Sequence, residues 1–226
     1  MPGSPPPDVH VLDDPAAAVG ELLAAQARHG GAIVLTGGST PGKAYERAAR
    51  LEPDWSRVTV WWGDERCVPP DDERSNYRLA QETLLERLTS APAAEHRIRG
   101  ELPPDEAARE LDEQLDGAQL DFLLLGLGPD GHCASLFPGS PQLGVEDRRA
   151  VSGPPGLEPF VERVTMTMPV LRSARRIVFL ATGAAKADAV ARAFGDDISA
   201  EVPASLVRLA PVTVEAFLDP PAAGRL

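Results

Sequence analysis

The sequence predicts an α/β fold in which helices cover both faces of a doubly wound, mostly parallel sheet. Short apolar strands alternate along the chain with longer helical segments, and continuous apolar strands are typical of a sheet buried on both faces. The 226 residues are 43 % hydrophobic and 25 % charged, which suits a globular protein. No internal repeat or linker divides them, so we expect a single domain over residues 1–226, with residues 1–9 as a flexible tail rich in proline.

Capping residues mark the elements of the first half. Asp14 and Pro15 are expected to begin a helix that stops at Gly30, because aspartate caps a helix and proline fits its first turn. Ser75 is expected to cap a later helix. The elements predicted here are helices over 15–29, 41–50 and 76–88 and strands over 32–35 and 58–62.

The second half continues the alternation. The elements predicted there are helices over 105–115 and 186–194, strands over 120–126, 164–168 and 177–183, and a short element followed by a last strand within 207–218. Segment 139–162 is rich in Pro and Gly, so we expect a long surface loop there.

Composition excludes several classes of protein. The net charge of −12 argues against nucleic acid or an anionic membrane as a partner. Two cysteines make no disulfide framework, and the N-terminus MPGSPPPDVH lacks the features of a signal peptide. No apolar run reaches the roughly 18 residues of a membrane span, so we expect a cytoplasmic protein. The four histidines are scattered, so neither a metal nor another cofactor is expected.

Four of the predicted strands end in loops that carry polar residues. The loops are TGGST (36–40), GDER (63–66), GPDGH (128–132) and ATGAAK (181–186). The carboxyl ends of parallel strands meet at one edge of a sheet, where α/β proteins bind their ligands. The sequence therefore predicts a site at which these four loops converge.

The first loop is typical of phosphate binding. Gly37 and Gly38 allow the backbone to turn tightly, and Ser39 and Thr40 supply hydroxyls and amides beside the N-terminus of a helix. The alternative interpretation is a βα turn that is capped by Ser or Thr and binds nothing.

The other loops carry groups that move protons or bind anions. His132, two residues after Asp130, can exchange a proton near neutral pH. Arg66 offers a planar fork of donors. Lys186 lies in the first turn of a helix, where a cation is unfavourable unless an anion binds. The alternatives are a structural histidine, a surface ion-pair cluster and a solvated lysine.

Two short motifs resemble nucleotide-binding sequences but lack residues that these sequences require. GGSTPGK (37–43) matches the start of a P-loop, but Ala44 replaces the hydroxyl that holds Mg²⁺ and Pro41 removes an amide. GLGPDG (126–131) matches a dinucleotide fingerprint, but prolines from Pro138 onward interrupt the helix that must follow. Neither an NTPase nor a nicotinamide or flavin enzyme is expected.

Six segments, in consistent order over nearly the whole chain, resemble one known family. They are LTGGSTP (35–41), WWGDERCVP (61–69), SNYRLAQETLL (75–85), LLLGLGPDGHCASLFPGSP (123–141), RVTMTMPVLRSAR (163–175) and TGAAKADAV (182–190). Together they look like the 6-phosphogluconolactonase family, in the superfamily shared with glucosamine-6-phosphate deaminase. The resemblance implies a Rossmann-like fold of the phosphosugar isomerase type.

A lactonase is the first of three possible functions for this chain. Deaminases of this type usually carry tyrosine in place of Arg66 and glutamate in place of Phe137, whereas Cys133 stands where the lactonases usually have threonine. The implied reaction is hydrolysis of 6-phospho-D-glucono-1,5-lactone to 6-phospho-D-gluconate in the oxidative pentose phosphate pathway. The alternatives are a phosphosugar isomerase or deaminase and a phosphosugar-binding protein without catalysis. The expected partner is a small phosphorylated sugar lactone, and the expected state is a monomer or small homo-oligomer.

The hypothesis for the reaction is a general-base mechanism. His132 would activate a water, Asp130 would orient its imidazole, and Arg66 or backbone amides would stabilise the oxyanion. Ser135 is a disfavoured nucleophile because no G-x-S-x-G motif surrounds it. The residues expected to bind substrate or its phosphate are Gly37, Gly38, Ser39, Thr40, Asp64, Gly131, Arg163 and Lys186.

Overall fold

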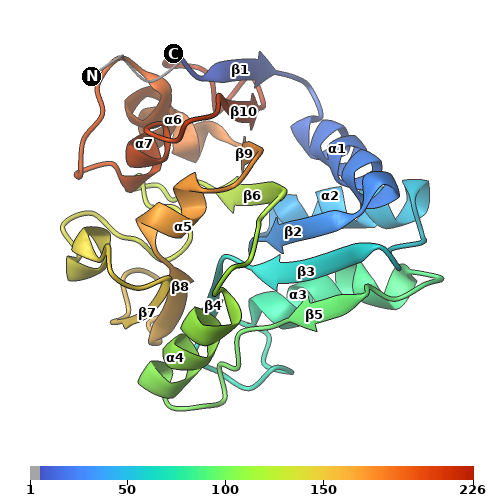
Figure 1. The fold of residues 1–226 in the computed structure, drawn as a ribbon. Helices are drawn as coiled ribbons and strands as arrows, with labels where there is room; N and C mark the ends of the chain where they lie inside the picture. The colour runs from blue at the N-terminus through green and yellow to red at the C-terminus, as the bar shows by residue number, and fades with distance from the viewer. Residues whose placement is uncertain (1–5) are drawn as a thin grey trace.

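The computed structural model describes residues 6–226 and has a seven-stranded sheet at its centre (Figure 1). The strands are β1 (Asp8–Val11), β2 (Gly31–Leu35), β3 (Val58–Trp62), β5 (Ala94–His96), β6 (Phe122–Gly126), β9 (Ile177–Ala181) and β10 (Val214–Leu218). They lie in the order β1-β10-β9-β6-β2-β3-β5, and every neighbouring pair is parallel. The parallel sheet that the apolar runs predict is confirmed.

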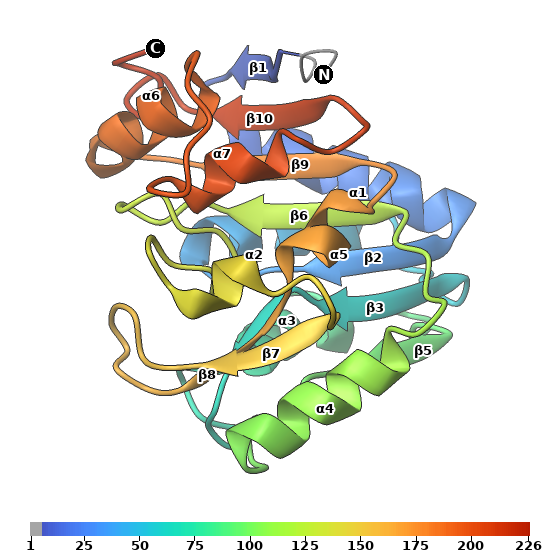
Figure 2. The ribbon, with the colours of Figure 1, turned by 60° about the vertical axis from the view of Figure 1, so that its left-hand side comes forward.

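Helices cover both faces of this sheet. They are α1 (Pro15–His29), α2 (Ser39–Leu51), α3 (Asn76–Thr83), α4 (Pro104–Gln114), α5 (Met168–Arg172), α6 (Ala187–Phe194) and α7 (Pro203–Val207), with 3₁₀ helices at Leu85–Arg87, Pro141–Gly144 and Ala184–Lys186. Figure 2 shows α1, α2 and α3 behind the sheet and α4, α5 and α7 in front of it. The doubly wound arrangement is thus confirmed, and it explains why β2, β6 and β9 are buried along almost their whole length.

Large apolar side chains fill the space between the layers. Trp55, Trp62 and Phe122 are fully buried. Burying side chains of this size stabilises the fold by about 1.5–3 kcal/mol each, before the entropy of ordering them is counted. None of the helices in residues 6–226 is both long and apolar enough to cross a membrane.

The predicted helix caps are present. Asp14 Oδ1 accepts a hydrogen bond of 2.9 Å from the Ala17 N–H at the start of α1. Ser75 Oγ accepts one of 3.2 Å from the Arg78 N–H at the start of α3. α1 ends at Gly30, whose φ of 83° lies in the left-handed region that favours glycine.

A second, antiparallel sheet lies in front of the first and was not predicted (Figure 2). It consists of β4 (Asp64–Arg66), β7 (Ala150–Gly153) and β8 (Arg163–Met166), in the order β4-β8-β7. Gly63 joins the two sheets, because its N–H donates to the carbonyl of Leu35 at 3.0 Å and its carbonyl accepts from the N–H of Met166 at 2.9 Å.

This second sheet corrects two predictions for the middle of the chain. Segment 139–162 is not one long loop, because it contains β7 and a 3₁₀ helix. The strand predicted over 164–168 begins one residue earlier and ends at Met166. Helix α5 follows it at once, since Pro169 fits the first turn of a helix.

Smaller corrections concern the edges of the main sheet and one helix. Residues 8 and 9 were expected in the flexible tail, but they lie in β1 and pair with β10, while residues 1–5 lie outside the described part of the chain. β5 was not predicted, because three half-exposed residues give no apolar run. The helix predicted over 76–88 ends at Thr83 and continues only as a 3₁₀ turn.

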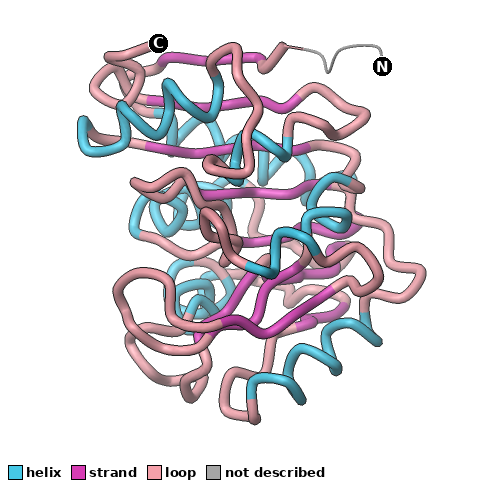
Figure 3. The backbone as a smooth tube through the Cα atoms, turned by 90° about the vertical axis from the view of Figure 1, so that its left-hand side faces the viewer, coloured by secondary structure: helices cyan, strands magenta, loops and turns pink. Residues whose placement is uncertain are grey.

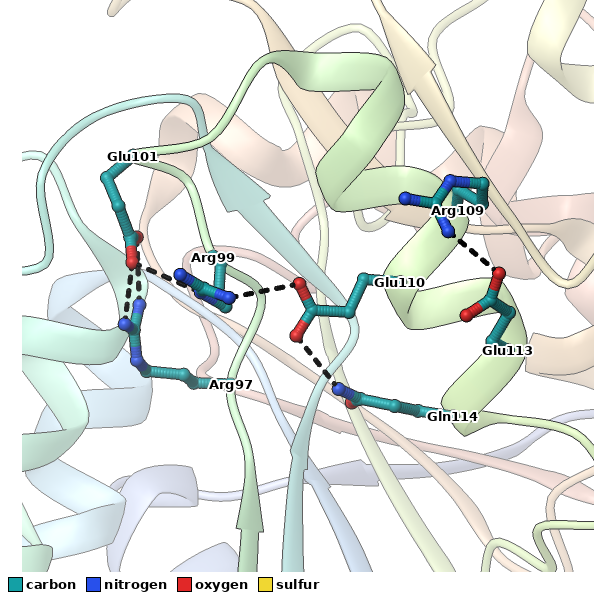
Figure 4. Close-up of polar contacts among 7 residues, drawn as sticks. All are labelled: Arg97, Arg99, Glu101, Arg109, Glu110, Glu113 and Gln114. Carbon is teal, nitrogen blue, oxygen red and sulfur yellow. Dashed lines mark hydrogen bonds and ion pairs between the residues drawn. The ribbon is translucent and has the colours of Figure 1, made fainter.

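Ion pairs connect α4 with the segment that precedes it (Figure 4). Arg97 donates two hydrogen bonds to Glu101, of 2.9 and 2.7 Å, and Arg99 lies 3.5 Å from both Glu101 and Glu110. These pairs are partly exposed, so each contributes no more than about 1 kcal/mol. None of these residues lines the cavity at the carboxyl ends of the parallel strands, which is described in the next section.

Candidate active site

A cavity of about 570 Å³ lies where β2, β3, β6 and β9 end. Loops crowd this edge of the sheet in Figure 3. All four predicted loops contribute to the cavity wall, together with segment 157–160 and Arg163. The expected convergence of the four loops is therefore confirmed, and the volume suits one phosphorylated sugar.

The first wall of the cavity is the N-terminus of α2. The helix begins at Ser39, two residues earlier than predicted, and its N-cap is Gly38, with φ of 111° and no side chain to cap the helix. The first N–H groups of α2 are thus left for a ligand, and the helix dipole favours an anion there. Gly37, Gly38, Ser39 and Thr40 all line the cavity, as the sequence predicts.

A buried tyrosine supports this wall from behind. The hydroxyl of Tyr45 accepts a hydrogen bond from the N–H of Thr36 at 2.8 Å and donates one to the carbonyl of the same residue at 2.6 Å. Tyr45 is fully buried, and this burial raises the pKa of its phenol, so it stays neutral and able to donate. The end of β2 is thereby fixed where it turns into the cavity.

Replacing Tyr45 with phenylalanine is expected to lower the free energy of unfolding by about 1–3 kcal/mol, because two buried backbone groups lose their partner. Urea denaturation monitored by circular dichroism measures the change. Tyr77→Phe is the matched control, since within residues 6–226 its hydroxyl has a single hydrogen bond, which it accepts from the half-buried Gln81 side chain. Equal losses in the two variants would contradict this role for Tyr45.

The ATGAAK loop closes the next wall. Thr182 contacts Thr40 through their hydroxyls at 2.8 Å, so this loop and the start of α2 are joined directly. Lys186 is half-buried at the N-cap of α6 and lines the cavity. Partial burial lowers the pKa of Lys186, and the carboxylate of Asp130 opposes this shift. The lysine is therefore a cation held partly out of water beside the loop that carries His132.

His132 is oriented by Asp130, as predicted. Its Nδ1 lies 2.6 Å from Asp130 Oδ1, which also accepts the backbone N–H of His132 at 3.1 Å. With Nδ1 donating to the carboxylate, a neutral imidazole keeps its free lone pair on Nε2. Partial burial acts to raise the pKa of Asp130, but the hydrogen bonds and charge of His132 hold it below its usual value. His132 lines the cavity, and Phe137 packs against its ring at 4.5 Å between centroids.

Two glycines allow this loop to form. A Cβ on Gly128 would lie 2.0 Å from His132 Nδ1, so only glycine leaves room for the imidazole. Gly131 has φ of 94°, and a Cβ there would lie 2.8 Å from the side chain of Val202. Gly131 and Asp130 do not line the cavity themselves, so both act from behind His132.

Two arginines face the cavity from the second sheet. Arg66 and Arg163 lie opposite each other in the β4–β8 register, and both line the cavity. Arg66 donates to the carbonyl of Arg74, and Arg163 donates to the carbonyls of Leu157 and Pro159 at 2.9 and 3.1 Å. Burial lowers the pKa of Arg163, and the carboxylate of Asp64 opposes the shift. Neither guanidinium has a carboxylate ion-pair partner within residues 6–226, so an anionic ligand would compensate their charge.

The two acids of the GDER loop have different surroundings. Glu65 is buried, and its carboxylate accepts hydrogen bonds from the N–H groups of Arg66, Asn76 and Tyr77 and from the hydroxyl of Ser75. Burial raises the pKa of Glu65, against these backbone hydrogen bonds, which act to lower it. Glu65 therefore holds the N-terminus of α3 and does not line the cavity, whereas Asp64 does.

The serine and the lysine that the alternative mechanisms would need lie outside the cavity lining. Ser135 is 5 % exposed and does not line the cavity, and its hydroxyl donates to Asp64 Oδ2 at 2.6 Å, so it points away from the place where a substrate carbonyl would bind. Lys43, the lysine of the P-loop match, is exposed and outside the cavity lining. Asn76 lines the cavity and was missed by the sequence analysis, because the sequence marks it only as the first residue of a helix capped by Ser75.

Comparison with known proteins decides the family. The family model for glucosamine-6-phosphate isomerases/6-phosphogluconolactonase matches residues 11–215. The chain belongs to this family. A probable 6-phosphogluconolactonase 1 of Arabidopsis thaliana is 34 % identical to this family member over 92 % of the chain and 87 % of its own length. The 6-phosphogluconolactonase of Mycobacterium leprae is 39 % identical over 80 % of both chains.

Solved structures of the family agree with the fold. The 6-phosphogluconolactonase of Trypanosoma brucei superposes with a TM-score of 0.84 at 28 % identity and covers 97 % of this chain and 98 % of its own. A monomeric glucosamine-6-phosphate deaminase has a TM-score of 0.85 at 21 % identity, covering 97 % of this chain and 100 % of its own, so it shows the fold alone.

Proposed function

We propose that this family member is a 6-phosphogluconolactonase, which hydrolyses 6-phospho-D-glucono-1,5-lactone to 6-phospho-D-gluconate. The observation that carries the proposal is one sugar-sized cavity that holds both an Asp-oriented histidine and several cationic or N–H donor groups. Relatives that bear the name 6-phosphogluconolactonase over most of the chain support the same reaction. Arg66 and Phe137 favour this activity over that of a deaminase, because the related deaminases usually carry tyrosine and glutamate at these two positions.

The phosphate is assigned to the first wall of the cavity. A dianion there would accept hydrogen bonds from the N–H groups at the start of α2 and from the hydroxyls of Ser39 and Thr40. Lys186 would add a point charge, because the contact between Thr40 and Thr182 holds its loop against the same wall. Each charge-assisted hydrogen bond contributes about 1.5–3 kcal/mol to binding. These groups orient the lactone and take no part in bond breaking.

The chemistry is assigned to His132 and the arginines. His132 Nε2 takes a proton from a water, which attacks C1 of the lactone, while Asp130 stabilises the imidazolium that forms. Charge develops on the carbonyl oxygen, and Arg66 is the candidate to stabilise it. Collapse of the tetrahedral intermediate breaks the bond from C1 to the ring oxygen, and His132 returns the proton to that oxygen. Arg163 lies opposite Arg66 on the neighbouring strand β8 and adds a second positive charge to the same side of the cavity.

Replacing Lys186 with alanine is expected to raise KM for the phosphorylated lactone about tenfold and to change kcat little, because a charge-assisted contact is lost. Unphosphorylated gluconolactone should show no such change in KM. Lys43→Ala is the matched control, since this lysine is exposed and lies outside the cavity lining. An unchanged KM in Lys186→Ala would remove the phosphate assignment.

A proton-release assay tests the proposed activity. The lactone is made freshly from glucose 6-phosphate, and the spontaneous rate of hydrolysis is subtracted. Catalysed proton release is the expected result, and its absence would overturn the proposal. Incubation with glucosamine 6-phosphate tests the alternative, because release of ammonia would identify a deaminase instead.

A further inference from the structure

The carboxylate of Asp64 is held by two other buried side chains. Ser135 Oγ donates to Oδ2 at 2.6 Å, and Asn76 Nδ2 lies 3.3 Å from Oδ1 and donates to the backbone carbonyl of Asp64 at 2.9 Å. Asp64, Asn76 and Ser135 are 5, 2 and 5 % exposed, respectively. Water has little access to these contacts, so they fix the direction of the carboxylate.

The three residues come from different parts of the fold. Asp64 is the first residue of β4, Asn76 is the first residue of α3, and Ser135 lies shortly after the GPDGH loop (128–132) in the sequence. Ser135 is itself fixed, because its N–H donates to Thr165 Oγ1 on β8 at 3.2 Å. The position of the carboxylate is therefore set jointly by the second sheet, by α3 and by the loop that carries the proposed base.

The remaining lone pairs of this carboxylate are available to a ligand. A carboxylate offers about four acceptor positions, and Asp64 lines the cavity. It forms no ion pair in the part of the chain that the structure describes. A phosphate would be repelled by its charge, whereas an O–H group can donate to it. The chemistry therefore selects a hydroxyl of the sugar.

Asn76 also touches the phosphate-binding wall. Its Oδ1 is buried without a hydrogen-bond partner, and a Cβ on Gly37 would lie 1.9 Å from it. An unpaired buried acceptor is unfavourable, and a fold that retains one calls for an explanation. The Asn76 amide thus lies between the loop assigned to the phosphate and the carboxylate assigned to a hydroxyl, and its hydrogen bonds go to Asp64.

We propose that Ser135 and Asn76 are positioning residues that hold Asp64 as the acceptor for a ring hydroxyl of the substrate. This inference rests on the proposed lactonase function and assigns one ring hydroxyl of that substrate to Asp64. Neither residue touches the reacting carbonyl, and both act through the Asp64 carboxylate.

The test compares substrates that lack one hydroxyl. The 2-deoxy, 3-deoxy and 4-deoxy forms of the phosphorylated lactone are made by oxidation of the corresponding deoxyglucose 6-phosphates. For the natural chain, kcat/KM is expected to be about tenfold lower with one of the three, since a hydrogen bond to a charged group is lost. Ser135→Ala should lower kcat/KM about tenfold for the full lactone and less than about threefold for that deoxy lactone. Asn76→Ala should show the same pattern.

Thr167→Val is the matched control. Thr167 is fully buried and donates its hydroxyl to the carbonyls of Arg148 and Arg149, away from the cavity. It is expected to lower stability without changing the ratio of kcat/KM between the full and deoxy lactones.

Different failures have different meanings. If Ser135→Ala lowers kcat/KM by one common factor for all four lactones, or leaves it unchanged, the positioning role is wrong and the lactonase function stands. If the natural chain discriminates against none of the deoxy lactones, the hydroxyl assignment is wrong. If the natural chain hydrolyses no lactone and calorimetry detects no binding of 6-phosphogluconate, the proposed function fails, and this inference fails with it.

Discussion

Replacing His132 with asparagine is expected to lower kcat by at least about a hundredfold, within the range that general-base catalysis usually supplies. Asparagine is of similar size and can still donate to Asp130, but it cannot accept the proton of the attacking water. KM should change little, because the groups assigned to the phosphate are untouched. Steady-state proton release on fresh lactone measures both constants.

This experiment separates an enzyme from a phosphosugar-binding protein. Calorimetric binding of 6-phosphogluconate and the melting temperature serve as controls, and both should match those of the natural chain. A kcat within about threefold of the natural value would exclude His132 as the base. The base would then have to be sought among the other groups that line the cavity.

Replacing Gly128 with alanine is expected to cause a comparable loss of kcat without removing any polar group. The new methyl group would lie 2.0 Å from His132 Nδ1 and cannot coexist with the imidazole in its present place. The ring must move away from Asp130, so the contact of 2.6 Å is broken and Nε2 changes its direction. Displacements of about 1 Å at a reacting group can cost a hundredfold in rate.

Gly144→Ala is the control for this substitution. Gly144 is the last residue of the 3₁₀ helix Pro141–Gly144, and no atom of residues 6–226 would lie within 4 Å of its added Cβ. We expect it to leave kcat unchanged. If Gly128→Ala retains full kcat while its structure is intact, the orientation of the imidazole by Asp130 is not required for the reaction.

The sequence predicted the inner strands of the main sheet because most of them are buried on both faces, whereas the edge strands β1 and β5 were missed. β2, β6 and β9 are continuous apolar runs of five residues, and their shortness and the glycines beside them favour a buried strand over a buried helix. Once the strands are parallel, the convergence of their loops follows from geometry. Asp130 and His132 were proposed as a pair because they are close in the sequence, but the contact between them also requires the room left by Gly128, which the spacing alone does not reveal.

The missing parts depend on contacts between distant segments. β5 and β7 have three and four residues, and their polar or exposed positions give no periodic signal. The hydrogen bond between Ser135 and Asp64 joins residues 71 positions apart, and no local sequence pattern predicts it. Asn76 was read only as the start of a helix, because its amide acquires its second role from the packing of α3 beside β4.

The junction at Gly63 divides the residues proposed for catalysis between two hydrogen-bonded ladders. Asp130 and His132 follow β6 of the parallel ladder, whereas Arg66 and Arg163 lie on the antiparallel one. The outer strand β7 carries neither of these arginines, so substitutions in β7 can shift β8 and Arg163 while the contact between His132 and Asp130 is kept. The placement of the arginines around a ligand can thus vary independently of the histidine and the aspartate.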